Sequence, residues 1–276
     1  MIGIRDVKVG KVTIGAGKPF VLIAGPDSIE SREHLVRMAR ELKAITEGEG
    51  VPWILKASWD KANRASAGAW RGVGLREGVD CLKAVRLEVG CARVTDVHET
   101  WQATQVAVET EMLQVPALLS RQTDLIRACS LFRQPVLLKK GQFMAAGAMR
   151  GAVEKAEDAP GVVLCERGNC FGYGRLVVDF TNIPRLAAIG WPVAVDCSHP
   201  CQLPSDEGGA SGGVASDVGT LAACALAAGA HALFIEVHDD PANAPCDGAI
   251  ATDLKALPAL LRRLRALRVD VPEVSK

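Results

Sequence analysis

The chain is poor in aromatic side chains, which make up 4% of its 276 residues and include a single tyrosine. It also lacks an excess of either charge, because Lys plus Arg and Asp plus Glu both number 32. A neutral chain has no overall basic field to attract nucleic acid or an anionic membrane, so we expect neither partner. An anionic ligand would have to be held by a local cluster of cations.

A CxxC pair is absent among the nine cysteines, and Cys197 and Cys201 are the closest approach to one. An odd cysteine number without disulfide-scaffold spacing fits a reducing compartment. Because buried free cysteine is common, Cys197 and Cys201 are interpreted as free thiols, with a redox or metal pair as the alternative. The opening MIGIRDVKVGKVTIG lacks the apolar core of a signal peptide, and no stretch reaches the roughly 20 apolar residues of a membrane helix. We therefore expect a cytoplasmic protein.

Short runs rich in Val, Ile and Leu are what the chain does contain, each followed by an amphipathic stretch of helical length. Such alternation predicts buried parallel strands joined by crossover helices. The helical stretches include Ser31–Glu47, Thr220–Ala228 and Ala256–Leu267. The predicted strands are Phe20–Gly25, Pro52–Ser58, Ala92–Val97, Met112–Ala117, Pro135–Gly141, Gly161–Arg167, Pro192–Ser198 and Ala232–His238.

Eight such units admit a closed barrel or a doubly wound open sheet, and the polar residues after the strands favour the barrel. In chain order these residues are Asp27, Lys56, Asp96 with His98, Gln114, Lys139 with Lys140, Arg167, His199, and Glu236 with His238. A barrel gathers every strand end around one mouth, whereas an open sheet gathers only those near its switch point. We predict an α/β fold, a (β/α)₈ TIM barrel, as one domain over residues 1–276.

The segment VKVGKVTIG, with Gly10 at its turn, predicts a short N-terminal β-hairpin at about residues 5–15. It precedes the first predicted strand and could plug the bottom of the barrel. At the other end, residues 270–276 are expected to form a flexible tail.

Cations are concentrated in KASWDKANR, where Lys56, Lys61, Asn63 and Arg64 follow a predicted strand directly. Together with Lys139 or Lys140 and with Arg167, they place five or more cations near one cavity. Arg binds phosphate oxygens in a bidentate fork and Lys adds point charge, so this cluster fits a ligand carrying two phosphates. A solvated loop around Lys61 and Arg64 is the alternative.

One histidine and three carboxylates form a second cluster, made of Asp27, His199, Glu236 and Asp247. Oxygen ligands with one imidazole suit Mn²⁺, Fe²⁺, Mg²⁺ or Zn²⁺. A hydrogen-bonded polar network is the alternative, although carboxylates packed together without a cation would raise one another's pKa.

Three further features accompany these clusters. Asp96 and His98 in TDVHE have the chemistry for acid/base catalysis or for orienting a hydroxyl. The glycine-rich run Gly208–Gly213 could wrap a phosphate or form a lid. His34 and His231 are interpreted as surface or packing residues.

Seven motifs, in the same order along the chain, carry a resemblance to a known family. They are KASWDKANR, TDVHE, PALLSRQTD, KKGQF, CERGNCFGY, GGASGG and FIEVHDDPANAPCDG. From about Phe20 to Leu267 the chain resembles the 3-deoxy-D-manno-octulosonate-8-phosphate synthases, also called phospho-2-dehydro-3-deoxyoctonate aldolases. The resemblance implies a barrel transferase of lipopolysaccharide biosynthesis that joins phosphoenolpyruvate to arabinose 5-phosphate, needs no organic cofactor and forms homotetramers.

The resemblance also assigns roles to individual residues. It implies that phosphoenolpyruvate is held by Lys56, Lys61, Lys139 and Arg167, and that Asn63 and Arg64, the latter from a neighbouring subunit, hold arabinose 5-phosphate. The other expected substrate-binding residues are Ser66, Gln114, Gln142, Phe171 and Ser211. The expected catalytic residues are Lys56, Lys61, Asn63, Asp96, His98, Lys139, Arg167 and His199. His199, Glu236 and Asp247 match the family's metal positions.

Departures from the family pattern concern the metal and the acceptor. Asp27 stands where metal-dependent members have Cys and metal-independent members have Asn, whereas Cys246-Asp247-Gly248 is similar to the metal-independent sequence. Ala65 replaces a Ser that helps hold the sugar phosphate, and Val214-Ala215 stands in place of an Arg after the glycine run. Two alternatives therefore stay open: a 3-deoxy-heptulosonate-7-phosphate-type synthase that uses erythrose 4-phosphate, and a non-catalytic sugar-phosphate-binding homologue.

Overall fold

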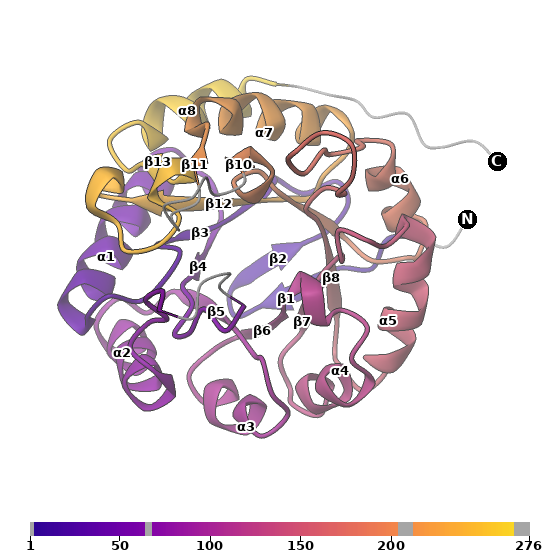
Figure 1. The fold of residues 1–276 in the computed structure, drawn as a ribbon, viewed down its shortest axis with the longest axis horizontal. Helices are drawn as coiled ribbons and strands as arrows, with labels where there is room; N and C mark the ends of the chain where they lie inside the picture. The colour runs from indigo at the N-terminus through magenta and orange to yellow at the C-terminus, as the bar shows by residue number, and fades with distance from the viewer. Residues whose placement is uncertain (1–2, 64–67, 204–211, 268–276) are drawn as a thin grey trace.

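The computed structural model describes residues 3–63, 68–203 and 212–267. Within them, the predicted (β/α)₈ barrel is confirmed: eight parallel strands form a ring that closes because β12 pairs with both β9 and β3 (Figure 1). Each strand lies inside its predicted run. The ring consists of β3 (Val21–Gly25), β4 (Trp53–Lys56), β5 (Ala92–Asp96), β6 (Met112–Val115), β7 (Val136–Lys139), β8 (Val162–Glu166), β9 (Val193–Asp196) and β12 (Ala232–His238).

Helices surround the ring (Figure 1). They are α1 (Arg32–Gly48), α2 (Leu75–Glu88), α3 (Gln102–Ala107), α4 (Thr123–Ser130), α5 (Met149–Lys155), α6 (Asn182–Ala187), α7 (Val218–Ala227) and α8 (Leu257–Arg265). Helix α1 begins at Ser31, whose Oγ accepts a hydrogen bond from the His34 backbone N–H at 3.1 Å. Its buried Leu35, Met38 and Leu42 recur at helical spacing and pack in the core shared with the strands.

Shorter elements lie in the loops. The short strands are β10 (Gln202–Leu203), β11 (Gly212–Gly213) and β13 (Thr252–Asp253). The 3₁₀ helices are η1 (Ala117–Leu119), η2 (Ala146–Ala148), η3 (His199–Cys201), η4 (Ala215–Asp217), η5 (Pro241–Asn243) and η6 (Gly248–Ile250).

The predicted N-terminal hairpin consists of β1 (Val7–Val9) and β2 (Val12–Ile14). Gly10 opens its two-residue turn with a φ of 57°, which a residue with a side chain rarely adopts. Val7, Val9 and Ile14 are buried among the inward-facing strand residues. The hairpin therefore plugs one end of the barrel, as predicted.

Strand alternation determines which side chains face the barrel axis. On β4, Ile54 lies in the inner core with the hairpin, whereas Leu55 lies in the outer core between strands and helices. Successive strand residues point to opposite faces, so Lys56 returns to the inside. On the other strands too, the residue two positions after an inward-facing apolar residue is polar and faces the inside of the barrel. These residues are Lys56, Asp96, Gln114, Lys139, Arg167, Asp196 and Glu236.

Gly25 is the exception on β3, and its lack of a side chain is required. A Cβ at Gly25 would lie 2.1 Å from the Lys56 carbonyl oxygen and 2.9 Å from Leu55 Cδ1. We expect Gly25→Ala to lower the free energy of unfolding by about 3 kcal/mol, because backbone must move to admit the methyl group. Urea denaturation measures this change.

Gly151→Ala is the matched control, because a Cβ there meets nothing within 4 Å and the residue lies in α5. Alanine should stabilise that helix by roughly 0.5–1 kcal/mol. Equal urea midpoints for Gly25→Ala and the original chain would contradict the close approach of β3 and β4.

The remaining predictions concern a membrane helix and the C-terminal tail. Among the described residues, no helix combines the length and apolar character needed to cross a membrane. The segment expected to be a flexible tail, residues 270–276, lies outside the described residues.

Candidate active site

A cavity of about 740 Å³ opens at the carboxyl ends of the barrel strands. Most of the residues predicted from the sequence line it together. They are Lys56, Lys61, Asn63, Asp96, His98, Gln114, Lys139, Gln142, Arg167, Phe171, His199, Glu236 and Asp247. Asp27 is buried beside this wall and forms an ion pair with Lys61. Arg64, Ser66 and Ser211, together with Ala65 and most of the glycine-rich run, lie outside the described residues.

Lys56 is held by a network that also contains a residue missed from the sequence, Ser58. The Lys56 ammonium lies 2.7 Å from Ser58 Oγ and 3.2 Å from Asp96 Oδ1. Ser58 Oγ donates to Asp96 Oδ2 at 3.0 Å, and Gln114 Nε2 donates to Asp96 Oδ1 at 2.8 Å. Ser58 lies inside the KASWDKANR motif, two residues after Lys56. This spacing was the signal in the sequence that could have identified Ser58 as a site residue.

The charge of Asp96 follows from these partners. Burial alone would raise the pKa of Asp96, but Lys56 and Lys61 outweigh it and lower the pKa to about 2. Asp96 is therefore ionised at neutral pH, and both of its oxygens accept hydrogen bonds. This arrangement favours a role in orienting neighbouring groups over proton donation by Asp96.

His98 lies next to this network with its ring edge-on to Trp59, at a centroid distance of 5.6 Å. Its Nε2 is 3.9 Å from Asp96 Oδ2. Burial lowers the pKa of His98 despite the nearby carboxylate, so the ring is neutral at pH 7. A neutral imidazole in a cavity can accept a proton.

Asp196 is the second site residue missed from the sequence, and it organises three predicted ones. The Lys139 ammonium and His199 Nδ1 each lie 2.7 Å from Asp196 Oδ2, and Arg167 Nε lies 4.0 Å from the same oxygen. The Asp196 side chain is fully buried; burial alone would raise its pKa, but His199 and Lys139 hold it well below the usual range. The signal was a carboxylate two residues after Ala194 in an otherwise apolar strand.

The two adjacent lysines at the end of β7 have different surroundings. Lys139 lines the cavity, with its ammonium 3.5 Å from the centroid of the Phe234 ring. Lys140 is absent from the cavity wall. Its ammonium is fully buried, donates to Asn169 Oδ1 at 2.8 Å and lies 3.3 Å from Glu166 Oε1.

Every predicted cation of the described cavity wall has a carboxylate neighbour. Lys56 lies near Asp96, Lys61 pairs with Asp27, and Lys139 and Arg167 share Asp196. The sequence led us to expect a concentration of cations, and the structure interleaves these cations with buried anions. Such pairing fixes the position of each ammonium or guanidinium group before a ligand arrives.

Asp27, His199 and Glu236 form one of the groups that could hold a metal ion, because their ligand atoms lie within 4.8 Å of one another. Both carboxylate oxygens of the fully buried Glu236 lack a hydrogen-bond partner among the described residues. Burial and the neighbouring Asp27 raise the pKa of Glu236 to about 8. Burial lowers the pKa of His199, so its ring is neutral, with one nitrogen facing Asp196 and the other left to act as a ligand.

Asp247 belongs to a second group, with Asp27 and Cys246. The four predicted ligands thus belong to two groups that share Asp27. To contact a single ion, the side chains of the two groups would have to move closer together. Asp247 has a left-handed backbone with a φ of 50° and accepts a hydrogen bond from Gln202 Nε2 at 3.1 Å. Burial and the adjacent Asp27 raise the pKa of the Cys246 thiol, so it is protonated in the absence of a cation.

Comparison with known proteins gives consistent matches over nearly the whole chain. The sequence profile described as the DAHP synthetase I family matches residues 3–272. The 2-dehydro-3-deoxyphosphooctonate aldolase of Trichlorobacter lovleyi is 44% identical over 265 residues, which cover 95% of this chain and 97% of the relative. Proteins of the same name from Bordetella petrii and Magnetococcus marinus are 45% and 46% identical, each over 95% of this chain and over 94% and 92% of the relative.

Proposed function

Because the chain belongs to the DAHP synthetase I family, we propose that it is a carbon–carbon-forming transferase that condenses phosphoenolpyruvate with an aldose phosphate and water. The aldose is arabinose 5-phosphate, and the products are 3-deoxy-D-manno-octulosonate 8-phosphate and phosphate, in keeping with the name that the relatives carry. One observation carries the proposal: the strand ends present paired, pre-positioned cations to a single cavity.

The cations divide into two sides of the cavity. On one side Lys139 and Arg167 share Asp196, and on the other Lys56 and Lys61 surround Ser58. Phosphoenolpyruvate has a carboxylate and a phosphate, and each is expected to take charged hydrogen bonds from these groups. Asn63 at the cavity edge is assigned to the acceptor, together with Arg64.

The reaction joins carbon 3 of the enol to the aldehyde carbon of the sugar. The aldehyde oxygen takes up a proton, and water adds its oxygen to carbon 2 and loses one proton. Phosphate then leaves with the bridging oxygen and the electron pair of its bond to carbon 2, while the carbon 2 hydroxyl gives its remaining proton to the phosphate and becomes the carbonyl. We assign the water proton to His98, whose neutral ring lies in the cavity beside the ionised Asp96. Lys56 and Lys139 keep the enol in position during these steps.

The residues near Glu236 fit a divalent metal ion such as Mn²⁺, Fe²⁺, Mg²⁺ or Zn²⁺. The donors are one imidazole and carboxylate oxygens, and the unpaired oxygens of Glu236 and Asp27 Oδ2 are buried without a compensating hydrogen bond among the described residues. We propose that Asp27, His199, Glu236 and Asp247 hold the ion. It would polarise the aldehyde oxygen or lower the pKa of the attacking water.

Removal of the metal is expected to lower phosphate release at least tenfold, and added Mn²⁺ should restore it. Asp27→Asn should weaken metal binding by about 10–100-fold, because the substitution removes a charged ligand. Mn²⁺ titration of chelator-treated protein measures the affinity, and phosphate release measures the rate. Equal rates with Mn²⁺ and with excess chelator would remove the metal from the proposal.

A panel of aldose phosphates tests the acceptor. The protein is incubated with phosphoenolpyruvate and either arabinose 5-phosphate or erythrose 4-phosphate, and phosphate release and the ulosonate product are followed. Preference for arabinose 5-phosphate is expected. Preference for erythrose 4-phosphate would assign the heptulosonate-type reaction. Absence of phosphate release with every aldose phosphate would overturn the proposal that the protein is an enzyme.

Exposed aromatic side chains near the cavity support assembly into a homotetramer. Phe171 and Tyr173 are 83% and 74% exposed, and Phe171 lines the cavity. We propose that a neighbouring subunit covers them, and light scattering at several protein concentrations tests the mass. Because both substrates are multiply charged and cross membranes poorly, we place the reaction in the cytoplasm.

A further inference from the structure

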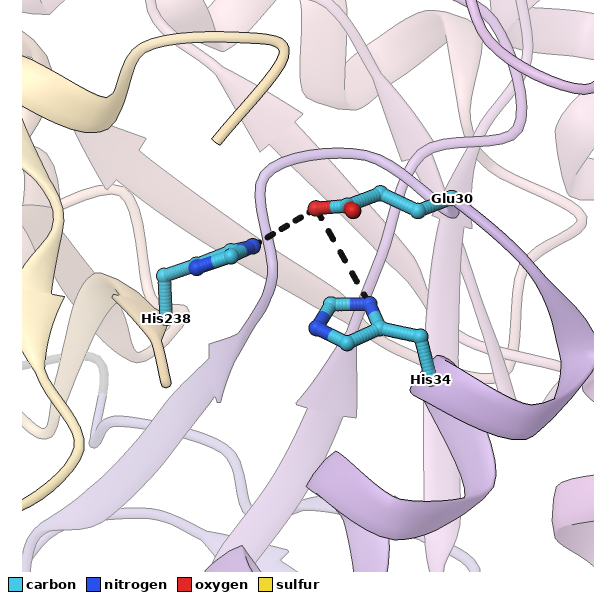
Figure 2. Close-up of side chains that lie close together, drawn as sticks. All are labelled: Glu30, His34 and His238. Carbon is cyan, nitrogen blue, oxygen red and sulfur yellow. Dashed lines mark hydrogen bonds and ion pairs between the residues drawn. The ribbon is translucent and has the colours of Figure 1, made fainter. Parts of the chain in front are cut away.

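A third group of side chains that could hold a metal ion lies outside the cavity wall. Glu30 follows β3, His34 lies in the first turn of α1, and His238 ends β12 (Figure 2). Their ligand atoms lie within 4.8 Å of one another. Figure 2 shows the Glu30 carboxylate facing both rings. The two rings are 5.0 Å apart between centroids.

His34 has a buried nitrogen without a partner. Its Nε2 lies 2.9 Å from Asp239 Oδ1, and Arg37 donates to Asp239 Oδ2 at 2.5 Å. The Asp239 carboxylate is the acceptor of both contacts. A neutral His34 therefore donates from Nε2 and keeps its lone pair on Nδ1.

That lone pair points toward another acceptor. His34 Nδ1 has no hydrogen-bond partner among the described residues and lies 3.9 Å from Glu30 Oε1. The His34 side chain is only 9% exposed, whereas Glu30 is 29% exposed and gives access from solvent. Two facing acceptors in a largely buried place need a cation or a water molecule between them.

We propose that Glu30, His34 and His238 form a second metal-binding site, which takes a divalent ion of the Zn²⁺ type and is separate from the active site. Two imidazoles and one carboxylate are donors that suit Zn²⁺. The carboxylate of Asp239 behind His34 completes the usual arrangement, in which an outer carboxylate orients the ligating ring.

His238 has to change its tautomer when the ion binds. Its Nδ1 now accepts the Asp240 N–H at 2.9 Å, so Nε2 carries the proton and donates to Glu30 Oε1 at 2.6 Å. Ion binding moves this proton to Nδ1, where Asp239 Oδ1 is 3.5 Å away, and the Asp240 N–H gives up its acceptor. Ligand bonds of about 2.0–2.2 Å place two ligand atoms of one ion roughly 3.3 Å apart. Since the nitrogens of His238 and His34 now lie 2.6 and 3.9 Å from Glu30 Oε1, His238 must move away by roughly 0.7 Å and His34 must move closer by roughly 0.6 Å.

The position of the site suggests what the ion does. Glu30 and His238 are 208 residues apart in sequence and lie after the first and at the end of the last strand of the ring, where β3 pairs with β12. An ion bound there links the first and the last strand of the ring, β3 and β12. Because the unfolded chain keeps these ligands far apart, the ion stabilises the folded state.

Zn²⁺ titration of the full-length, chelator-treated protein tests the site by calorimetry and by thermal unfolding. Compared with the original chain, His34→Gln and Glu30→Gln are each expected to bind one Zn²⁺ fewer, or to bind it at least 100-fold more weakly. Both should also lose the part of the Zn²⁺-induced rise in Tm that belongs to this site. Glu30→Gln retains an acceptor for His238 and guards against loss of fold in the other variant.

His231→Gln is the control, because His231 contacts the Val193 N–H and lies outside all three groups of possible metal ligands. It should bind as many Zn²⁺ ions as the original chain. The loss of one ion is expected whether or not the active-site group binds metal, so this result is independent of the metal proposed for catalysis. Unchanged Zn²⁺ stoichiometry and affinity in either His34→Gln or Glu30→Gln would overturn the site.

Discussion

Lys139→Met is expected to lower kcat/KM for phosphoenolpyruvate about a thousandfold. The change removes an ammonium group that lies over Phe234 and beside Asp196, and a charged hydrogen bond to the substrate is worth about 1.5–3 kcal/mol. It also leaves Asp196 with one cation fewer, which disturbs Arg167 and His199. A combined loss of about 4 kcal/mol corresponds to the stated factor, and steady-state kinetics with varied phosphoenolpyruvate measures it.

Lys140→Met is the matched control, because Lys140 is the adjacent residue and is buried as deeply. Its ammonium contacts Asn169 and Glu166 and does not line the cavity. We expect a loss of about 3 kcal/mol in the free energy of unfolding, since the buried Glu166 loses the cation that it pairs with, and most activity per folded molecule should be retained. The reverse pattern, with activity lost in Lys140→Met and kept in Lys139→Met, would contradict the assignment.

The barrel could be predicted because its signals are local and repeated. A buried strand such as Val162–Glu166 reads as an apolar run, and the helix after each strand has its own period. The period of two along a strand also explains why Lys56 and Glu236 could be placed at one mouth from the amino-acid sequence alone. Chain order around the ring then follows from right-handed crossovers between neighbouring strands.

Pairing between side chains of different strands could not be predicted in the same way. Asp196 and Lys139 are 57 residues apart, and their contact depends on where β7 and β9, the strands on either side of β8, place their ends. Nothing in the local sequence says that the cavity's cations are matched by buried anions. A charged residue within an apolar strand, such as Asp196, is nevertheless a usable signal, because burial without a partner is costly.

The metal-site residues show the same limit. The sequence grouped Asp27, His199, Glu236 and Asp247 as one set of ligands, but the structure divides them into two groups that meet at Asp27. His34 was interpreted as a packing or surface residue, because a lone histidine on a helix gives no sign of a partner in a distant part of the chain. Only the fold brings it to His238.

Asp196→Asn is expected to lower kcat/KM by about 10²–10⁴, through position rather than through contact with substrate. Asp196 Oδ1 accepts hydrogen bonds from the Ser198 and His199 backbone N–H groups at 3.1 and 3.0 Å. In the Asn variant, the side-chain oxygen is therefore expected to take this position. The amide NH₂ would then face the Lys139 ammonium and His199 Nδ1, donor against donor. The charged hydrogen bond from Lys139, worth about 1.5–3 kcal/mol, is lost, and the close approach of His199 Nδ1 to a carboxylate becomes an approach to a donor.

Metal affinity separates this positioning role from general damage to the fold. Since Asp196 orients His199, the Asp196→Asn protein should bind Mn²⁺ about 10–100-fold more weakly. Asp253→Asn, which alters an exposed carboxylate that caps the Lys255 N–H, should leave both Mn²⁺ binding and kcat/KM unchanged. If Asp196→Asn retains the original Mn²⁺ affinity and kcat/KM, the buried carboxylate does not position the two groups, and Lys139 and His199 must be held by their own strand ends alone.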